Sequence, residues 1–560
     1  MADYLETCGQ WRNDPYFDEL DRQAVLELSD AQMRDRFSSE LRFGTGGIRA
    51  VTGIGTNRIN RYTIRKITQS LADELNARSD AQPSVVVAFD TRHHSGEFAL
   101  ETALTLCTNG IKVSLFREPV PTPVLSFSVR HLRCSAGVVI TASHNPPQYN
   151  GYKVYDSSGC QIIDKETVLL DERIRSIDIQ NVRPIDEEAA INSKLLSYLG
   201  SEVLAAFRKE VLLLSGSASE NRIDVVYSPL HGTGAKPVPD VLRACGHRVL
   251  VVSEQALPDG SFPTLSVPNP EKPEAFSLAI SLARASGAPL VMVSDPDCDR
   301  IGVAVSHHGD YRILSGNQVG ALLIRYLCIR DSARINASDT VIKTIVTSDF
   351  GADIAASYGI CTLQTLTGFK NIGHLIDNFE ADPISTRRTF FFGYEESCGY
   401  LYGTHSRDKD AVSAAMLISE MCAHYLSLGL TLVDVLEQLF QQFGYYADAL
   451  ETHAFEDPAE PEEIMARVRS TGASISADIL CVKDYLRPTD GLPQSNVLKL
   501  CFDPGSWIAI RPSGTEPLLK IYYSAKGETA NLAKRKLADL MRLIQQYIEP
   551  APFSHKTSLR

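Results

Sequence analysis

The strongest constraint on the fold is a pattern that occurs three times along the chain: an apolar strand runs directly into a loop of reactive side chains. The three strands and their loops are residues 136–140 with 141–146, 291–294 with 295–300, and 389–392 with 393–399. Amphipathic segments lie between them, such as residues 62–77, in which apolar residues recur at intervals of three and four. In α/β sheets, ligands bind at the carboxyl ends of the strands. The repeat therefore predicts an α/β protein in which three separate loops carry the chemistry.

A chain of 560 residues is too long for one hydrophobic core, and ordinary domain sizes predict about three to five domains. An acidic, proline-bearing stretch at 456–461 indicates a boundary ahead of a smaller C-terminal unit. Strands are expected at 84–89, 111–116, 137–140, 223–227 and 339–342, and helices at 187–214 and 528–548. We predict an α/β fold of three similar α/β domains plus a smaller C-terminal α+β domain, at residues 1–205, 206–320, 321–450 and 451–560.

The formal net charge of −13 argues against nucleic acid as a partner, because a phosphate backbone is bound by clustered cations. An anionic substrate must then be met by local arginine and lysine side chains. The twelve cysteines show no C-x-x-C spacing and fall mostly inside apolar segments, as reduced core thiols of a cytosolic protein would. The N-terminus lacks a basic and then apolar signal, and no apolar run approaches a membrane span. We therefore expect a cytoplasmic protein without a membrane partner.

Ser143 stands in a polar turn, Thr141-Ala142-Ser143-His144-Asn145-Pro146, directly after the first apolar strand. A hydroxyl in this position can accept a phosphoryl or acyl group. Alternatively, Ser143 and Asn145 only cap the turn, because both side chains readily bond the local backbone and Pro146 ends the strand. The chemistry of the other two loops favours the reactive interpretation.

Three carboxylates at alternate positions, Asp295, Asp297 and Asp299, follow the second strand. Alternation in an extended turn can aim all three at one point, and hard oxygen ligands suit Mg²⁺. A solvated acidic turn is the plainer alternative. An EF-hand calcium loop is excluded, because it needs Gly at its sixth position and Glu at its twelfth, where this chain has Arg300 and Ser306.

Two further loops offer groups that suit a sugar phosphate. Residues 393–399 place two adjacent acceptors, Glu395 and Glu396, beside the hydroxyl of Ser397, a combination that can hold sugar hydroxyls. Residues 511–517 supply a guanidinium fork, two hydroxyls and a glycine-opened backbone, which together make a phosphate cradle.

These four loops, in this order, resemble the signature loops of the α-D-phosphohexomutases, and specifically the long phosphoglucomutase type that also includes phosphopentomutases. The likeness covers nearly the whole chain. It implies three similar α/β domains and a smaller fourth one around a central cleft, so that loops far apart in sequence share one site.

The resemblance also implies catalytic roles. Ser143 would be the phosphorylated nucleophile, and its oxygen would complete a Mg²⁺ site with Asp295, Asp297 and Asp299. The other implied residues are Lys153 for proton transfer or phosphate orientation, Arg300 for charge at the transferring group, His144 for positioning the serine loop, and Arg49 from the motif 43–49. Plainer alternatives are a surface ion pair for Arg300, a purely electrostatic role for Lys153 and a simple glycine turn around Arg49.

Substrate contacts are implied for a larger set. Its members are Gly368, Lys370, Glu395, Ser397, Arg407, Lys409, Arg511, Ser513, Gly514 and Thr515. Glu395 and Ser397 match the pair that binds ring hydroxyls, and the Arg511 loop suits the phosphate that is not reacting. Many relatives carry an aromatic residue just after the lysine of the Gly368 loop, but this chain has Asn371 there. That departure leaves the preferred sugar open.

In the implied reaction, phosphate passes from phosphoserine to a sugar monophosphate, and the bound bisphosphate reorients before the other phosphate returns to Ser143. We expect interconversion of glucose 1-phosphate and glucose 6-phosphate, with Mg²⁺ as cofactor and glucose 1,6-bisphosphate as primer and intermediate. A phosphopentomutase acting on ribose or deoxyribose phosphates is the nearest alternative. A metal-dependent sugar phosphatase, with its nucleophile in the aspartate run, and a non-catalytic sugar-phosphate sensor are less favoured.

Overall fold

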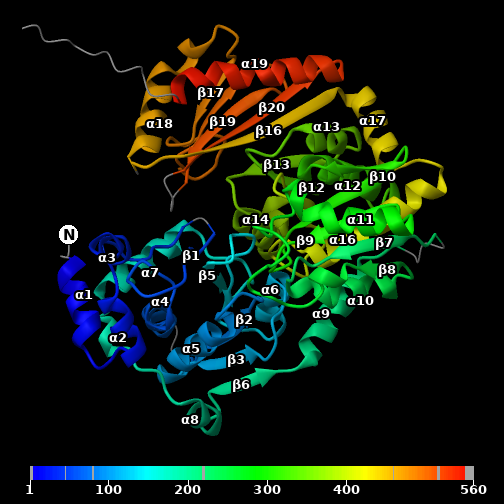
Figure 1. Ribbon diagram of the computed structural model, residues 1–560. Coiled ribbons are helices and arrows are strands. Elements are labelled where there is room, and N and C mark those ends of the chain that lie inside the picture. The colour runs from blue at the N-terminus through cyan, green and yellow to red at the C-terminus, as the bar shows by residue number, and fades with distance from the viewer. Residues whose placement is uncertain are drawn as a thin grey trace, which may run out of the picture.

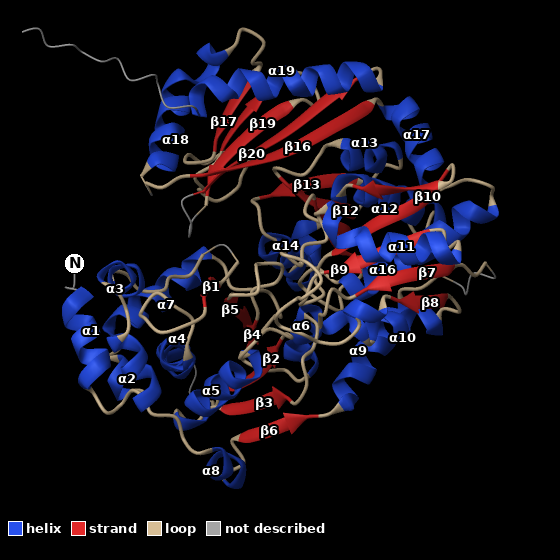
Figure 2. Cartoon of the chain, viewed as in Figure 1, coloured by secondary structure: helices blue, strands red, loops and turns tan. Residues whose placement is uncertain are grey.

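The computed structural model describes residues 4–44, 46–78, 81–216, 221–457, 459–513 and 518–548. These residues form four β-sheets with helices packed on them, and the C-terminal sheet lies apart from the other three, at the top of the view (Figure 1). Figure 2 shows that each part mixes helices and strands. The expected architecture, three α/β domains and a smaller α+β domain, is confirmed.

The first sheet has the strand order β1-β5-β4-β2-β3-β6. Its central strand β2 pairs in parallel with β3 and β4, while β5 runs antiparallel to β4. The strands expected at 84–89, 111–116 and 137–140 are β2, β3 and β4, and the helix expected at 62–77 is α4. The elements of this domain are α1 (Tyr4–Asn13), α2 (Glu19–Leu26), α3 (Asp30–Phe37), β1 (Ile48–Val51), α4 (Arg61–Arg78), β2 (Ser84–Phe89), α5 (Ser95–Thr108), β3 (Lys112–Phe116), α6 (Thr122–His131), β4 (Ala136–Ile140), β5 (Tyr149–Asp156) and α7 (Asp164–Ser176).

The single helix expected over 187–214 is wrong, because a strand interrupts it. α8 (Glu187–Asn192) ends before β6 (Leu196–Leu199), and α9 (Ser201–Leu213) follows. β6 pairs in parallel with the outer edge of β3 and so satisfies backbone groups there. The apolar spacing of this short segment fits helix and strand alike, so the long-range pairing decides between them.

The second and third sheets have the strand orders β11-β10-β9-β7-β8 and β13-β12-β14-β15. The second contains β7 (Asp224–Ser228), β8 (Arg248–Val251), β9 (Leu290–Ser294), β10 (Ile301–His307) and β11 (Asp310–Leu314), with helices α10 (Pro237–Ala244) and α11 (Ser277–Ser286). The third contains β12 (Asp339–Thr344), β13 (Cys361–Thr365), β14 (Thr389–Glu395) and β15 (Gly399–Leu401), with helices α12 (Gly316–Arg330), α13 (Phe350–Ser357), α14 (Phe369–Ala381), α15 (Pro383–Thr386), α16 (Ala411–Ser427) and α17 (Leu432–Phe443).

One hydrophobic core joins these three domains. It contains fully buried side chains from β2, α6, β7, α12 and α16, which include Val86, Val124, Val225, Leu322 and Met416. Because protein interiors are close-packed, this shared core holds the loops at the strand ends in fixed relative positions. Among the described helices, none is by itself long and apolar enough to span a membrane; α16 and α17 pass that test only as a pair, which bends by 85°.

The fourth domain is an antiparallel sheet in the order β16-β20-β19-β18-β17. α18 and α19 cover one of its faces (Figure 1), and on the other face Trp507 and Tyr522 pack against Ile345 and Val346 of the third domain. The expected C-terminal helix is α19. The elements are β16 (Tyr445–Ala454), α18 (Glu460–Thr471), β17 (Cys481–Asp484), β18 (Leu498–Cys501), β19 (Trp507–Pro512), β20 (Leu518–Gly527) and α19 (Ala530–Ile548).

The predicted domain boundaries fall inside elements: position 205 lies in α9, 320 in α12 and 450 in β16. β16 pairs with β20 along its whole length, from Tyr445 to Ala454. The C-terminal sheet therefore begins at Tyr445, ahead of the acidic stretch at 456–461.

Candidate active site

The loops that follow β4, β9 and β14 lie together and are joined to one another. The amide of Ile301 donates a hydrogen bond to the carbonyl of Cys398 at 3.0 Å. The amide of Thr122, at the start of α6, donates to the carbonyl of Asp297 at 2.9 Å. Each loop also holds one non-glycine residue in the left-handed region: Ser143 (φ 50°), Cys298 (φ 54°) and Cys398 (φ 62°). Such conformations cost about 1–3 kcal/mol and cluster at functional sites, because the surrounding structure must hold them.

Ser143 connects the first of these loops to the second. Its side chain is buried, and its hydroxyl donates a hydrogen bond to Asp295 Oδ2 at 2.6 Å. The hydroxyl also lies 3.1 Å from Nδ1 of His144. The backbone amide of Ser143 donates to the hydroxyl of Thr141 at 2.8 Å, which holds the turn behind it. The predicted nucleophile is therefore in direct contact with the predicted metal cluster.

Arg92 fixes the serine loop and was missed by the sequence analysis. Its guanidinium, fully buried, donates to four backbone carbonyls of that loop: Ser143 at 2.6 Å, Pro146 at 2.8 Å, Tyr149 at 3.0 Å, and Asn145. Five donors in a rigid fork allow one arginine to bridge so many acceptors. No other described side chain bonds as many carbonyls of residues 143–149.

Asp90 and Phe262 hold Arg92 in place. The Asp90 carboxylate lies 3.4 Å from the guanidinium Nε and accepts from the backbone amide of Arg92 at 2.9 Å. The ring of Phe262, from the second domain, stacks on the guanidinium at 5.1 Å. The sequence signal that could have found this pair is Asp90-Thr91-Arg92, directly after β2.

Asp295, Asp297 and Asp299 form a buried cluster in which each offers one carboxylate oxygen within 4.8 Å of the others. Within the described part of the chain, Oδ1 of Asp297 and Oδ1 of Asp299 are buried and have no hydrogen-bond partner. Burial, followed by the charges of Asp297 and Asp299, raises the pKa of Asp295 well above its ordinary value. A cluster with unpaired buried oxygens and mutual repulsion suits a bound cation.

Lysine side chains neutralise part of this acidic cluster. Lys153, on β5, lies 2.9 Å from Asp297 Oδ2 and 3.8 Å from Asp299. Lys409 lies 3.1 Å from Asp299 and 3.1 Å from Asp408. Burial alone would lower the pKa of Lys409, but Asp299 and Asp408 outweigh it and raise that pKa. Lys409 therefore stays charged at the edge of the cluster.

Two arginines add further positive charge around the aspartate cluster. Arg300 pairs with Glu271 at 2.7 Å and lies 3.8 Å from Asp299. Arg49, on β1, donates to the side-chain carbonyl of Asn145 at 3.1 Å. Burial, followed by the charge of Arg300, lowers the pKa of Arg49.

His144 is uncharged at neutral pH. Burial, followed by the positive charges of Arg300 and Arg49, lowers the pKa of its imidazole well below the ordinary value. A neutral imidazole that contacts the Ser143 hydroxyl can orient it. This geometry agrees with the positioning role that we expected for His144.

The loop after β14 brings its carboxylates to the third-domain side of the site. Glu395 accepts a hydrogen bond from the amide of Gly368 at 3.0 Å, so these two predicted substrate contacts lie side by side. Ser397 is half-buried two residues further on. Lys370 is buried and pairs with Asp164 of the first domain at 2.6 Å. These side chains come together from loops nearly thirty positions apart.

Asn371 does not extend toward Glu395. Its side-chain amide, in the first turn of α14, donates to the carbonyls of Leu366 at 3.3 Å and Thr367 at 3.1 Å, which lie in the loop directly before that helix. Through these two hydrogen bonds Asn371 stabilises the Gly368 loop.

Arg407, predicted as a substrate contact, has a buried side chain that bonds to other parts of the protein. Its guanidinium is fully buried, donates to the carbonyl of Thr404 at 2.7 Å and pairs with Glu380 at the end of α14. Its backbone amide is bound by the hydroxyl of Ser126 on α6 at 2.8 Å. Burial and these partners make Arg407 a link between the first and third domains, and its role as a substrate contact stays a prediction.

The fourth domain turns cationic side chains toward the same loops. Arg511 on β19 is the direct strand partner of Lys520 on β20. Burial, followed by the charges of Arg511 and Arg300, lowers the pKa of Lys520, so all three cations lie near one another. The amide of Ser513 donates to the carbonyl of Leu518 at 2.7 Å. Gly514 and Thr515 lie outside the described residues. Lys520 was missed because a lone lysine in a strand carries no sequence signal.

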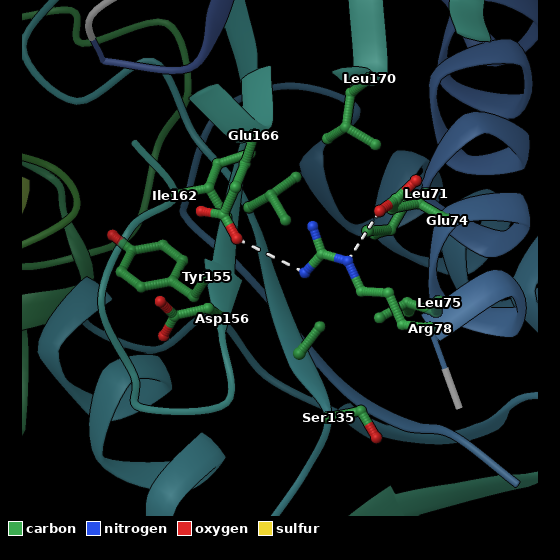
Figure 3. Close-up of a pocket in the computed structure, with 12 residues that line it drawn as sticks. Leu71, Glu74, Leu75, Arg78, Ser135, Tyr155, Asp156, Ile162, Glu166 and Leu170 are labelled. Atoms are coloured by element: carbon green, nitrogen blue, oxygen red, sulfur yellow. Dashed lines mark hydrogen bonds and ion pairs between the residues drawn. The ribbon is translucent and has the colours of Figure 1, made fainter. Parts of the chain in front are cut away.

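A small pocket in the first domain belongs to a different feature. Figure 3 shows the Arg78 guanidinium bonded to Glu74 at 2.7 Å and to Glu166 at 3.4 Å. The lining residues come from α4, β4, β5 and α7 and not from the loops that meet at Ser143. This pocket is a packing gap beside an ion-pair network.

Comparison with known families matches all four domains. Residues 40–181, 204–309 and 315–443 match the α/β/α domains I, II and III of phosphoglucomutase/phosphomannomutase, and residues 455–539 match its C-terminal domain. The chain is 35% identical over 537 residues to a phosphoglucomutase of Staphylococcus saprophyticus, covering 92% of this chain and 96% of that protein. It is 36% identical over 530 residues to a phosphoglucomutase of Staphylococcus aureus, covering 91% and 94%.

Solved structures share the fold. A phosphoglucomutase from Paramecium, parafusin, superposes with a TM-score of 0.69 at 18% identity, covering 91% of this chain and 95% of that one. A putative phosphomannomutase from Thermus thermophilus superposes with a TM-score of 0.66 at 22% identity, covering 90% and 99%. With four domain matches in order and more than a third of residues identical over nine-tenths of the chain, this protein belongs to the phosphoglucomutase/phosphomannomutase family, the α-D-phosphohexomutases.

Proposed function

We propose that this chain interconverts glucose 1-phosphate and glucose 6-phosphate through a phosphorylated Ser143 and a bound glucose bisphosphate. The observation that carries the proposal is the 2.6 Å hydrogen bond from the Ser143 hydroxyl to Asp295, which couples a nucleophile to the three-aspartate cluster. The phosphoglucomutase relatives support glucose as the sugar. An enzyme of this family is an intramolecular phosphotransferase of the isomerase class.

Asp295, Asp297 and Asp299 would hold Mg²⁺, together with an oxygen of the phosphorylated serine. The fit rests on the buried oxygens of Asp297 and Asp299 that have no hydrogen-bond partner among the described residues, and on the hard oxygen donors themselves. When bound, Mg²⁺ offsets negative charge on the phosphoryl oxygens.

The chain's own residues prepare Ser143 for transfer. Arg92 donates hydrogen bonds to four carbonyls of the loop around Ser143. The Ser143 hydroxyl is therefore oriented before the reaction begins and loses no further conformational freedom during it. Neutral His144 orients the hydroxyl through Nδ1. We assign Arg92 as a positioning residue and His144 as a catalytic residue that contacts the reacting oxygen.

Positive side chains stabilise the transferring group. Lys153 lies 2.9 Å from Asp297 and 3.8 Å from Asp299, beside the oxygens that would hold the metal, so we assign it an electrostatic role in phosphate orientation. Arg300 and Arg49 also lie near the cluster and contribute positive charge there.

The substrate would lie between the third and fourth domains. Glu395 and Ser397 would bind ring hydroxyls, with Gly368, Lys370 and Lys409 around them. Arg511 and Ser513, with Gly514, Thr515 and Lys520, would grip the phosphate that is not reacting. Because either end of the sugar must reach Ser143, this grip must serve both poses equally.

We further propose glucose 1,6-bisphosphate as the primer, because a free serine hydroxyl cannot donate to a monophosphate. Small sugar phosphates are then the partners, without nucleic acid or membrane, and the cytoplasm is the expected location. The net charge of −13 supports the exclusion of nucleic acid.

A substrate panel tests the proposal. Glucose, mannose, glucosamine and ribose 1-phosphates are assayed with Mg²⁺ and a catalytic amount of hexose bisphosphate, and glucose 1-phosphate should have the highest kcat/KM. Faster turnover of ribose 1-phosphate would instead identify a phosphopentomutase. Release of inorganic phosphate without any isomer would identify a phosphatase.

Intact-protein and peptide mass spectrometry gives an independent test of the nucleophile. The resting enzyme should carry one phosphate on Ser143, and Ser143→Ala should lose both the phosphate and the turnover while keeping its folded circular dichroism. Phosphate found only on an aspartate of residues 295–299 would contradict the serine mechanism.

A further inference from the structure

Two cysteines face each other at the edge of the C-terminal sheet. The edge strand β17 (Figure 1) runs antiparallel to β18, and Cys481 is the direct strand partner of Cys501. Directly opposed residues of an antiparallel pair lie on one face, with Cβ atoms about 4.5–5.5 Å apart. A disulfide needs Cβ atoms about 3.5–4.5 Å apart. A small inward shift of the edge strand therefore brings the two sulfurs into bonding range.

The exposure of this pair sets it apart from the core thiols. Eight of the twelve cysteines are buried, as expected from their apolar segments, but Cys481 is exposed and Cys501 is half-buried. An oxidant in solution therefore reaches Cys481 first. Burial, followed by a hydrogen bond with Cys481, raises the pKa of the Cys501 thiol to about 12. Cys501 therefore keeps its proton at neutral pH, which leaves the first oxidation step to the exposed Cys481.

Positive charge lies next to both sulfurs. Lys483 and Lys499 are direct strand partners two residues from Cys481 and Cys501, so all four side chains share one face of the sheet. Lys483 also pairs with Asp490 at 2.7 Å. Positive charge beside a sulfur stabilises the negative charge that develops on it as the thiol reacts. The pair thus combines proximity, access and a cationic surrounding.

The same face of the sheet makes contact with the third domain. Cys501 is the direct strand partner of Trp507, whose indole N–H donates to Asp349 at 3.2 Å. Lys499 lies over the Trp507 ring at 4.0 Å and donates to the carbonyl of Ile345 at 2.7 Å. A change at Cys501 therefore acts directly on the contact that fixes the fourth domain against the third.

We propose that Cys481 and Cys501 are a reversible disulfide site, oxidised by peroxides, that adjusts this domain contact. The Cys481 sulfur attacks one peroxide oxygen, the O–O bond breaks, the first water leaves and a sulfenic acid remains. The Cys501 sulfur then attacks the Cys481 sulfur, the S–O bond breaks, and the second water leaves with the thiol proton. Two thiols lose two electrons in total, and one hydrogen peroxide becomes two waters. A dithiol restores both thiols by exchange through a mixed disulfide.

The bond has a consequence for the proposed phosphate grip. Trp507, Ala509 and Arg511 alternate along β19 and so share one face of the strand. Drawing β17 toward β18 beside Trp507 shifts the backbone of β19, from which the Arg511 side chain projects. This consequence rests on the proposed function, and we expect the KM for glucose 1-phosphate to rise about fivefold or more on oxidation, the lower range of site-to-site coupling.

The full-length protein treated with hydrogen peroxide tests the proposal. Non-reducing peptide mapping should recover a peptide pair that joins Cys481 to Cys501, with the loss of two hydrogens. Trp507 is one of only two tryptophans, and the other, Trp11, lies in the first domain, so tryptophan emission should fall as the disulfide forms. Dithiothreitol should reverse both changes.

Two serine variants serve as controls. Cys481→Ser should give neither the linked peptide nor the emission change, and its reduced-state activity should equal that of wild type. Cys361→Ser, which removes a half-buried cysteine of β13 and keeps the pair, should respond like wild type. Cys481 recovered as a sulfinic acid, or joined to Cys481 of a second copy, would overturn the site. A linked peptide with unchanged KM would keep the site and refute its effect on the domain contact.

Discussion

Arg92→Lys tests whether the loop that carries Ser143 is held in place by one buried side chain. The arginine donates to the carbonyls of Ser143, Asn145, Pro146 and Tyr149. Lysine keeps the charge beside Asp90, so no buried carboxylate is left without a cation. Its single nitrogen cannot reach four acceptors that surround a planar fork.

The expected size of the effect follows from the bonds that are lost. If two of the four are lost, at about 1.5–3 kcal/mol for each hydrogen bond to a charged group, the loop loses about 3–6 kcal/mol of restraint. That matches or exceeds the strain of about 1–3 kcal/mol that a left-handed non-glycine residue such as Ser143 stores. Ser143 can then relax away from Asp295. A displacement of about 1 Å costs on the order of 100-fold in rate.

Steady-state kinetics and phosphoserine occupancy measure this effect. The kcat of Arg92→Lys should fall about 100-fold, while the KM stays within about threefold, because the variant changes nucleophile placement and leaves the sugar contacts intact. Arg284→Lys, at an exposed arginine paired with Asp310, is the matched control and should behave like wild type. A kcat within about twofold of wild type would refute the positioning argument. An equal rise in KM, or loss of the folded thermal transition, would show that Arg92 acts on the whole first domain instead.

Three further outcomes are expected. Asp297→Asn removes a charged ligand without changing its shape, so kcat should fall far more than substrate affinity. Full activity of the wild-type enzyme in excess chelator would contradict a metal site at these aspartates. Arg511→Lys should raise KM and lower kcat for phosphorylated substrates but not for an acceptor without the distal phosphate, and equal loss on both would place Arg511 elsewhere. Burial, followed by the charge of Glu395, raises the folded-state pKa of Glu396 to about 7. Between the ordinary carboxyl pKa and about 7, the folded state therefore holds a proton that the unfolded state has already released. The free energy of unfolding falls as the pH rises through this range. Glu396→Gln should therefore raise the melting temperature more at pH 8 than at pH 5, and an equal change at both would contradict the shift.

Local patterns in the sequence were enough to predict the parts that depend on near neighbours. The strands β4, β9 and β14 contain short apolar runs, and the loops after them are recognisable because serine, acidic residues and glycine stand at fixed short spacings. The contact between Ser143 and Asp295, across 152 positions, was implied by the resemblance and not by the spacing of either loop.

Other features depend on contacts between distant residues, and no local pattern distinguishes them. β6 is a strand because the edge of β3 is available to it, although its apolar spacing also fits a helix. Arg407 lies two residues before Lys409 in a motif that suggests substrate binding, and only the structure shows that Glu380 and the Thr404 carbonyl bind its guanidinium.

Arg92 and the Cys481–Cys501 pair show the same limit. Asp90-Thr91-Arg92 marks the end of a strand, and the two cysteines carry no pattern at all. The significance of each lies in the partners that folding brings to it: four carbonyls for the arginine and a second thiol across a strand pair for the cysteine. The sequence therefore determined which chemical groups this protein has and where in the chain they lie. The tertiary structure decided which of them meet, because the free energy of a buried contact depends on distance and desolvation, and neither quantity is encoded in local spacing.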